Sequence, residues 1–270
     1  MSTAQAHDTW FSSAVTLATA SSAQKSSLSP HRLDAIYAQS QLRVCIWPDY
    51  YSISYRDPRT FDLSGLDVDL ARELGRELGV HVSFVNSSFG TLADDLLNDR
   101  CDISMFAVGI TPERQEILRF TTPHLYSDVL GITTKTNKKI QTWQDIDQSD
   151  VVVSVAEGSF HELLMRERLE NAQLLLGRTP QAREQDVLSG RADVFMTDFP
   201  YTRRMLELTD WARLVVPDEP YHLLYYAWAM APGDDIWHER VQRFVDAIKT
   251  DGRLLKAAKK HQLDSAVVLD

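Results

Sequence analysis

The chain has 270 residues, enough for one large domain or for two lobes with separate hydrophobic cores. Its hydrophobic content of 44% and charged content of 24% are ordinary for a soluble globular protein. The net charge of −10 argues against nucleic acid or an anionic membrane as a partner. No run approaches the roughly 18 apolar residues that a membrane-spanning helix needs.

Residues 1–30 are rich in serine, alanine and threonine. The mildly apolar stretch 10–20 resembles the centre of a poor export signal, and residues 18–20 resemble a small-residue cleavage site. No lysine or arginine precedes Lys25, so the basic start of such a signal is missing. Three interpretations stay open: a degenerate export signal, a disordered lead-in, or a short helix packed on the body.

The sequence contains two cysteines, Cys45 and Cys101, without the spacing of a metal site. Both fall at predicted strands, which favours two buried free thiols. A disulfide in an oxidising compartment is the alternative.

The first half of the chain alternates between predicted helices and strands. We expect helices over 31–39, 67–79 and 92–98, and strands over 42–46, 80–85 and 103–106. Residues 47–50 are predicted to form a loop, because Pro48 stops the strand, and 56–64 carry turn residues. This rhythm predicts a parallel sheet with right-handed crossovers, whose ligands lie beyond the carboxyl ends of the strands. Residues 47–50, Phe89 and 109–114 fall at that edge.

Residues 102–126 carry the strongest local signal. A short buried strand is followed by a turn at Gly109 and by a helix that begins at Thr111. A hydroxyl at the N-cap, Pro112 and Glu113 are all typical of a helix start. Arg114 adds a planar guanidinium suited to bidentate capture of a carboxylate. These residues predict an anion site, with a surface arginine that caps its own helix as the alternative.

The second half of the sequence is predicted to form a smaller α/β unit. We expect strands over 129–134, 151–155, 174–176 and 194–196, helices over 160–170 and 184–189, and a helix start at 143. A strand over 221–230 then returns to the first unit, followed by helices over 236–250 and 252–261. The two crossings predict a hinge near 127–130 and 220–224. One lobe would comprise 31–127 and 224–270, and the other 128–223.

A predicted strand is followed by G-I-T-x-x-R at 109–114 and by F-T-x-P-H at 120–124. This order resembles the signature of type II periplasmic solute-binding proteins that serve polar amino-acid ABC transporters. The resemblance extends over roughly residues 33–264. It implies two lobes, each with a parallel or mixed sheet flanked by helices, joined by a two-strand hinge. It also implies a periplasmic monomer that needs no cofactor, binds an amino acid or close analogue and docks on an ABC permease.

The family resemblance also assigns roles within the site. Arg114 would bind the ligand α-carboxylate and Asp198 its α-ammonium, although Asp198 also suits the cap of a helix over 201–208. The turn at Glu157 would place Ser159 near the carboxylate, and Phe89 would stack on the ligand. The expected ligand-binding set is Arg114, Asp198, Ser159, Thr111, Gly109, Phe89, Trp47, Tyr50, Asp49 and Glu157.

Several members of this set have alternative roles. Thr111 is as suited to a helix cap as to ligand contact, and Gly109 offers only its backbone. Trp47, Tyr50 and Phe89 would form an aromatic wall, which is usual in small-ligand clefts. Asp49 and Glu157 would suit a basic ligand, or Glu157 would face solvent.

An enzyme on the same fold is the rival interpretation. The segments 32–36, 49–56, 109–115 and 196–198 also resemble cyclohexadienyl dehydratase, which eliminates water and CO2 from prephenate and also dehydrates arogenate. That enzyme's general acid is a glutamate three residues after the aspartate matched by Asp198. Here the position is Tyr201, and a phenol with an ordinary pKa of about 10 is a poor proton donor.

We therefore predict a binding protein rather than an enzyme. The eight histidines show no metal-ligand spacing, and neither a G-x-S-x-G sequence nor a phosphate-binding glycine loop is present. A ligand-sensing domain that signals to a partner is a third class that stays open.

Overall fold

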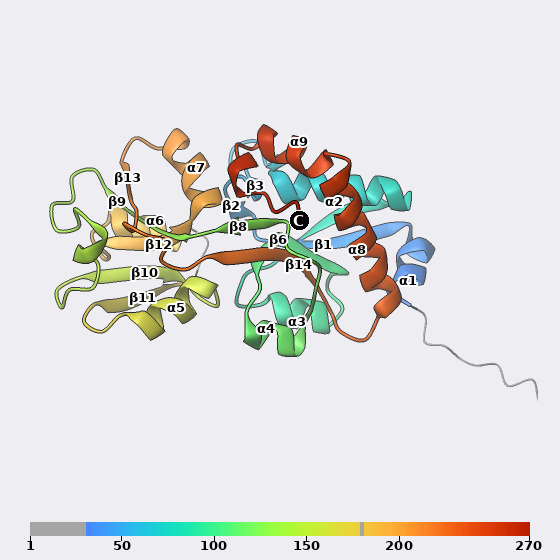
Figure 1. Ribbon diagram of the computed structural model, residues 1–270, viewed down its shortest axis with the longest axis horizontal. Helices are drawn as coiled ribbons and strands as arrows, with labels where there is room; N and C mark the ends of the chain where they lie inside the picture. Colours follow the sequence, from blue (N-terminus) through green and yellow to red (C-terminus); the bar gives the residue numbers. More distant parts are fainter. Residues whose placement is uncertain (1–30, 179–180) are drawn as a thin grey trace, which may run out of the picture.

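The computed structural model of the protein describes residues 31–178 and 181–270, so the interpretations of residues 1–30 lie outside the described residues. Figure 1 shows two sheets, each flanked by helices, side by side along the long axis. The expected two-lobed α/β fold is confirmed. Within the described ranges, no helix has the length and apolar character needed to cross a membrane.

The first sheet has six strands in the order β5-β1-β6-β14-β7, and β8 also pairs with β14. β1 is parallel to β5 and β6, whereas β14 is antiparallel to β6. The strands are β1 (Gln41–Ile46), β5 (His81–Asn86), β6 (Ile103–Gly109), β7 (Arg119–Phe120), β8 (Leu125–Ser127) and β14 (Leu224–Met230). The helices of this half are α1 (Arg32–Gln39), α2 (Leu66–Leu78), α3 (Leu92–Leu97), α4 (Pro112–Ile117), α8 (Asp235–Thr250), α9 (Arg253–Lys260) and the 3₁₀ turn η2 (Asp264–Ala266).

The second sheet has five strands in the order β11-β10-β12-β9-β13. β10 is parallel to β11 and β12, whereas β9 is antiparallel to both of its neighbours. The strands are β9 (Val129–Thr134), β10 (Val152–Ala156), β11 (Gln173–Gly177), β12 (Val194–Asp198) and β13 (Ala212–Val215). The helices are the 3₁₀ turn η1 (Trp143–Asp145), α5 (Phe160–Arg168), α6 (Ala182–Leu188) and α7 (Phe199–Leu208).

Sequence patterning predicts the long elements well and the short ones poorly. The predicted loop over 47–50 is wrong in part, because β2 (Asp49–Tyr50) pairs with β3 (Ser54–Arg56), which pairs with β4 (Leu63–Ser64). The helix start expected at 143 is only one 3₁₀ turn. The strands β7, β8 and β13 have two to four residues, too few to show a periodicity.

The two lobes are joined by two chain crossings, at β8–β9 and before β14, which run side by side in the middle of Figure 1. The Asp128 carboxylate accepts hydrogen bonds from the backbone N–H groups of Tyr221 at 2.9 Å and His222 at 2.7 Å. This one side chain therefore ties the two crossings together.

The prediction of two free thiols is wrong: Cys45 and Cys101 form a disulfide. Cys45 lies in β1, and Cys101 lies just before β6, the strand beside it. The Cα atoms of the two cysteines are 5.6 Å apart although the residues are 56 positions apart in sequence. The pairing depends on which strand neighbours β1, which local sequence does not reveal.

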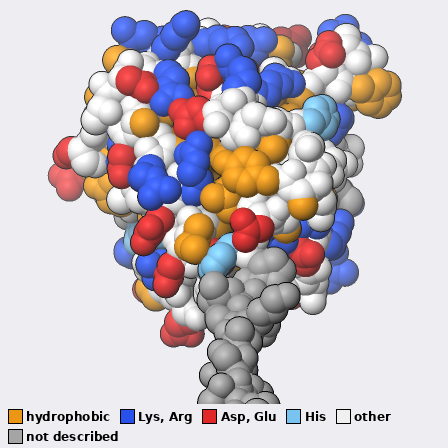
Figure 2. All heavy atoms as spheres, turned by 90° about the vertical axis from the view of Figure 1, so that its right-hand side faces the viewer, with side chains coloured by type: hydrophobic (Ala, Val, Ile, Leu, Met, Phe, Trp, Pro, Cys, Tyr) orange, Lys and Arg blue, Asp and Glu red, His pale blue; other side chains and the backbone are white. Residues whose placement is uncertain are grey.

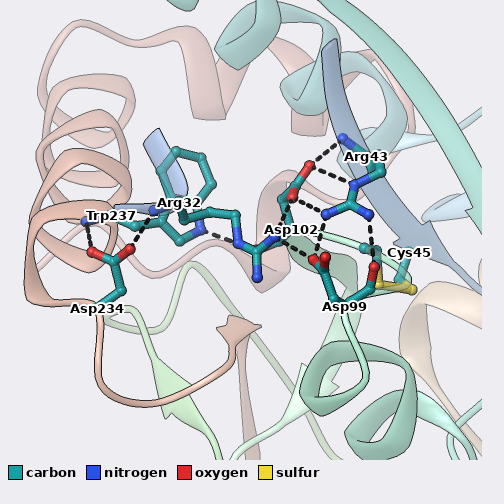
Figure 3. Close-up of polar contacts among 8 residues, drawn as sticks. Arg32, Arg43, Cys45, Asp99, Asp102, Asp234 and Trp237 are labelled. Atoms are coloured by element: carbon teal, nitrogen blue, oxygen red, sulfur yellow. Dashed lines mark hydrogen bonds and ion pairs between the residues drawn. A yellow bond between two sulfur atoms is a disulfide. The ribbon is translucent and has the colours of Figure 1, made fainter. Parts of the chain in front are cut away.

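The disulfide adjoins a partly buried ionic network. Figure 3 shows Arg32 and Arg43 converging on Asp99 and Asp102 beside Cys45. Asp102 is buried and accepts bonds from the Arg43 backbone N–H and Nη2, each at 2.7 Å. The network joins α1, β1 and the start of β6.

Breaking the disulfide is expected to lower the free energy of unfolding by about 4 kcal/mol, because closing a long loop removes much entropy from the unfolded chain. Denaturant unfolding with and without a reductant measures the difference. In the Cys45→Ala/Cys101→Ala double variant the reductant should have no effect. An unchanged wild-type midpoint on reduction would contradict the prediction.

Ion pairs also link the outer helices of the first lobe. Figure 2 views the end of the molecule where α1, α2 and α8 lie, and shows basic and acidic side chains interspersed there. Arg240 of α8 pairs with Glu77 of α2 at 3.0 Å, and Lys260 of α9 pairs with Asp69 of α2 at 2.7 Å. Such surface pairs contribute little each, so burial of the helices' apolar faces holds them in place.

Candidate functional site

The carboxyl ends of the strands from both sheets meet between the lobes. Trp47 follows β1 and Phe89 follows β5, and their ring centres are 5.0 Å apart. Tyr50 packs edge-on against both rings. From the second lobe, Tyr201 stacks on Trp47 with ring centres 6.3 Å apart. The three rings that were predicted to form an aromatic wall therefore pack together, and Tyr201 extends the aromatic cluster into the second lobe.

Arg114 occupies the boundary between the lobes. Its Nη1 donates to the Gly109 carbonyl at 2.9 Å, and its Nη2 donates to the Gly158 carbonyl in the other lobe at 3.0 Å. The side chain is buried, its guanidinium lies 5.9 Å from the centre of Phe89, and it makes no ion pair with a described carboxylate. Burial lowers the pKa of Arg114 to about 10, so the group stays positively charged at neutral pH.

Asp198 ends β12 and caps α7, because its Oδ1 accepts the Tyr201 backbone N–H at 3.0 Å. Its Oδ2 accepts the Tyr226 hydroxyl at 2.7 Å and also the Tyr50 hydroxyl from the first lobe. Burial, together with the charge of Asp198, raises the pKa of both tyrosines well above the usual value, so they remain protonated donors. The cap role is confirmed, and Asp198 is a buried carboxylate with partners in both lobes.

Thr111 and Ser159 cap the helices on either side of the boundary. The Thr111 hydroxyl accepts the Arg114 backbone N–H at 3.3 Å, and the Ser159 hydroxyl accepts the Glu162 backbone N–H at 3.3 Å. Gly109 ends β6, where an added Cβ would lie 2.7 Å from Leu224. The carbonyl of Gly109, rather than its N–H, is engaged by Arg114.

Asp49 and Glu157 also lie at the lobe boundary. The Asp49 carboxylate accepts a bond from Gln181 of the second lobe at 2.6 Å. Glu157 is exposed and lies 3.6 Å from Arg178, beside a cavity of about 480 Å³ that also contacts Trp47. Both acidic side chains therefore have partners within the protein.

Two buried residues of the cleft were missed by the sequence interpretation. Arg183 follows β11, and its guanidinium lies 4.7 Å from the Tyr201 ring and 5.4 Å from the Trp47 ring. His161 lies in the first turn of α5. Ligands of a parallel sheet lie beyond the carboxyl ends of its strands, and this was used to select residues in the first sheet. The same argument would have found Arg183, because β11 is parallel to β10 and ends at the same edge.

His161 should make stability depend on pH. Burial lowers the pKa of His161 from 6.5 to about 4; Arg183 and Arg114 also lower it, and Asp198 opposes them. The unfolded chain binds this proton as the pH falls below about 6.5, but the folded protein does so only near pH 4. Stability is therefore lost as the pH falls through that window, by about 3 kcal/mol at its lower end.

The His161→Gln variant should lose correspondingly less stability between pH 7.5 and pH 4. Denaturant unfolding of both proteins at the two pH values measures this difference. Equal losses in the variant and the wild type would show that His161 is not responsible.

Comparison with known proteins places the chain in a family. The family model for bacterial extracellular solute-binding proteins, family 3, matches residues 42–264. Cyclohexadienyl dehydratase of Pseudomonas aeruginosa is 31% identical over 234 residues, 86% of each chain. An amino-acid-binding protein of Dichelobacter nodosus is 27% identical over 219 residues, 79% of this chain and 85% of the relative.

A solved structure gives the same result. The crystal structure of an ancestral amino acid-binding protein, described as a precursor of cyclohexadienyl dehydratase, superposes with a TM-score of 0.77 at 30% identity, over 84% of this chain and 98% of the other. The two lobes and the cleft between them are thus those of a known fold. The chain belongs to the bacterial extracellular solute-binding proteins of family 3.

Proposed function

We propose that this protein captures an amino acid or a close α-carboxylate analogue between its lobes and delivers it to an ABC permease outside the cytoplasm. Arg114 would bind the α-carboxylate and Asp198 the α-ammonium. The aromatic wall would hold the ligand side chain, and Ser159 would approach the carboxylate as the lobes close. The protein would act as a periplasmic monomer.

The observation that carries this proposal is a pair of opposite charges buried at the lobe boundary. The side chains of Arg114 and Asp198 are 9% and 2% exposed. Neither makes an ion pair with another described side chain, and both act electrostatically on His161. Burying a charge without an opposite partner is costly, and a zwitterionic ligand would supply both partners.

The two lobes would move about the crossings tied by Asp128. We propose that one lobe comprises 31–127 and 224–270 and the other 128–223, in line with the strands of each sheet. Closure needs ligand contacts that exist only in the closed form. Arg114 would supply such a contact through the ligand carboxylate, because its guanidinium lies at the lobe boundary and its Nη2 reaches the Gly158 carbonyl of the opposite lobe.

The second candidate is a dehydratase, favoured by the similarity to the Pseudomonas aeruginosa enzyme. Burial raises the pKa of Tyr201 well above its usual value, and the Tyr201 hydroxyl donates to Glu184 at 2.6 Å. The tyrosine itself is thereby a weaker acid. The Tyr201 hydroxyl already donates its proton to a hydrogen bond with Glu184, so neither group offers a ready proton, and this ranks the dehydratase function below ligand capture.

A thermal-shift screen of the full chain against the proteinogenic amino acids tests the proposal, with prephenate and arogenate included and their products followed by absorbance. Saturable stabilisation by one class of amino acid without turnover is expected. Turnover of prephenate would show that the protein is a dehydratase and would contradict the proposal of ligand capture. Stabilisation by none of these compounds would overturn the amino-acid proposal.

A further inference from the structure

Arg183 is a second buried cation in the cleft. Its side chain is 3% exposed, and its Nη1 donates to the Met196 carbonyl at 2.9 Å. Its Nε and Nη2 have no hydrogen-bond partner among the described residues, and none of their carboxylates pairs with it. Buried polar groups normally have partners, so two unsatisfied donors on one cation require an explanation.

The free donors form one chemically defined group. Nε–H and Nη2–H lie on the same edge of the guanidinium, the edge from which arginine makes two parallel hydrogen bonds to a carboxylate. The opposite side is held in place by the Met196 carbonyl of β12. Arg183 is therefore oriented by its own lobe. Its two remaining donors could both bond to one acceptor group such as a carboxylate.

Aromatic rings from both lobes surround this guanidinium. In the second lobe, the guanidinium carbon lies 5.3 Å from the centre of the Phe195 ring and 4.7 Å from that of Tyr201. From the first lobe, Trp47 covers it at 5.4 Å, and the same Trp47 ring packs on Phe89, the aromatic neighbour of Arg114. Separation of the lobes would remove Trp47 from Arg183 and expose the guanidinium on the second lobe.

The neighbouring acids are already engaged. Glu184 accepts the Tyr201 hydroxyl at 2.6 Å, and Asp49 accepts Gln181 at 2.6 Å. Neither lies within ion-pair distance of Arg183. A negatively charged group from outside the chain is thus the partner that would satisfy the guanidinium at the least cost, because an anion offsets both its charge and its free donors.

We propose that Arg183 binds the side-chain carboxylate of the ligand, so that the captured amino acid is acidic. This inference rests on the proposed function and specifies its ligand class. An acidic amino acid carries two carboxylates and one ammonium, which matches two buried arginines and one buried aspartate. Arg114 would take the α-carboxylate, Asp198 the ammonium and Arg183 the distal carboxylate.

The test is a calorimetric titration of the full chain with L-glutamate and L-aspartate, their neutral counterparts L-glutamine and L-asparagine, and L-arginine. At least one acidic ligand should bind about 10- to 100-fold more tightly than its amide, the range expected for hydrogen bonds to a charged group. In Arg183→Gln, which keeps a donor for the Met196 carbonyl, that ratio should fall to about 1 while the amide still binds. Arg183→Lys should fall between the two, because it keeps the charge and loses the fork.

The outcomes separate this inference from the proposed function. Tighter binding of an amide or of L-arginine by the wild type would overturn the acidic ligand while leaving amino-acid capture intact. An unchanged acid-to-amide ratio in Arg183→Gln would do the same. If none of the five compounds binds, the proposal that the ligand is acidic is also wrong. The thermal screen then tests the proposed function separately. Stabilisation by another amino acid would retain amino-acid capture, and stabilisation by none would overturn it.

Discussion

Replacing Arg114 by alanine is expected to weaken binding of the α-carboxylate ligand by about 1,000-fold, since removing one partner of a buried charge pair costs about 3–5 kcal/mol. The ligand carboxylate would enter a site where the remaining Asp198 repels it. Alanine also cannot make the bond to the Gly158 carbonyl, which joins the lobes in the wild type. Calorimetric titration with the amino acid identified in the thermal screen measures the loss.

Two variants control this result. Arg114→Lys keeps the positive charge without the planar fork and should lose only about 10- to 100-fold in affinity. Arg119→Ala removes an exposed arginine just beyond the same helix and should bind like the wild type. Unfolding curves of the unliganded variants establish that each is folded. Retained affinity in Arg114→Ala would show that the α-carboxylate is bound elsewhere.

Gly158→Ala should weaken ligand binding by about 10- to 100-fold, because overpacking a tight contact costs about 1–3 kcal/mol. Gly158 has a φ of +71°, and an added Cβ would lie 2.4 Å from the Cα of Gly90 in the opposite lobe. Backbone atoms of a neighbouring segment cannot move aside as a flexible side chain can. With the lobes apart this clash disappears, so the substitution selects against the closed form that holds the ligand.

The facing glycine provides a matched control. A Cβ on Gly90 would meet nothing closer than the Glu157 carbonyl at 3.7 Å, an ordinary contact. Gly90→Ala should therefore bind ligand within about 3-fold of the wild type, a free-energy change below 1 kcal/mol. Small-angle scattering with saturating ligand should show a more extended Gly158→Ala protein. Equal affinity and equal compactness of both variants would mean that the lobes do not meet at these glycines in the bound form.

The two sheets of this protein show what kind of signal predicts a site. Residues at the carboxyl ends of β1, β5 and β6 were predicted from sequence to share one edge, and the structure brings Trp47, Phe89 and Arg114 together there. The same reasoning, applied to β11, would have included Arg183. It was missed because the residues between the predicted strand over 174–176 and the predicted helix over 184–189 were given no role.

Local sequence determined the main helices, the longer strands and the capping residues Thr111, Ser159 and Asp198, because periodicity and capping depend on residues a few positions apart. Only the tertiary structure decided that Cys45 meets Cys101, that Tyr50 and Tyr226 donate to Asp198, and that Trp47 covers Arg183. These contacts join residues that are 28 to 148 positions apart in sequence, and some of them cross the lobe boundary. They follow from the order of strands in each sheet and from the approach of the lobes, which are set by packing of the whole chain rather than by any one segment.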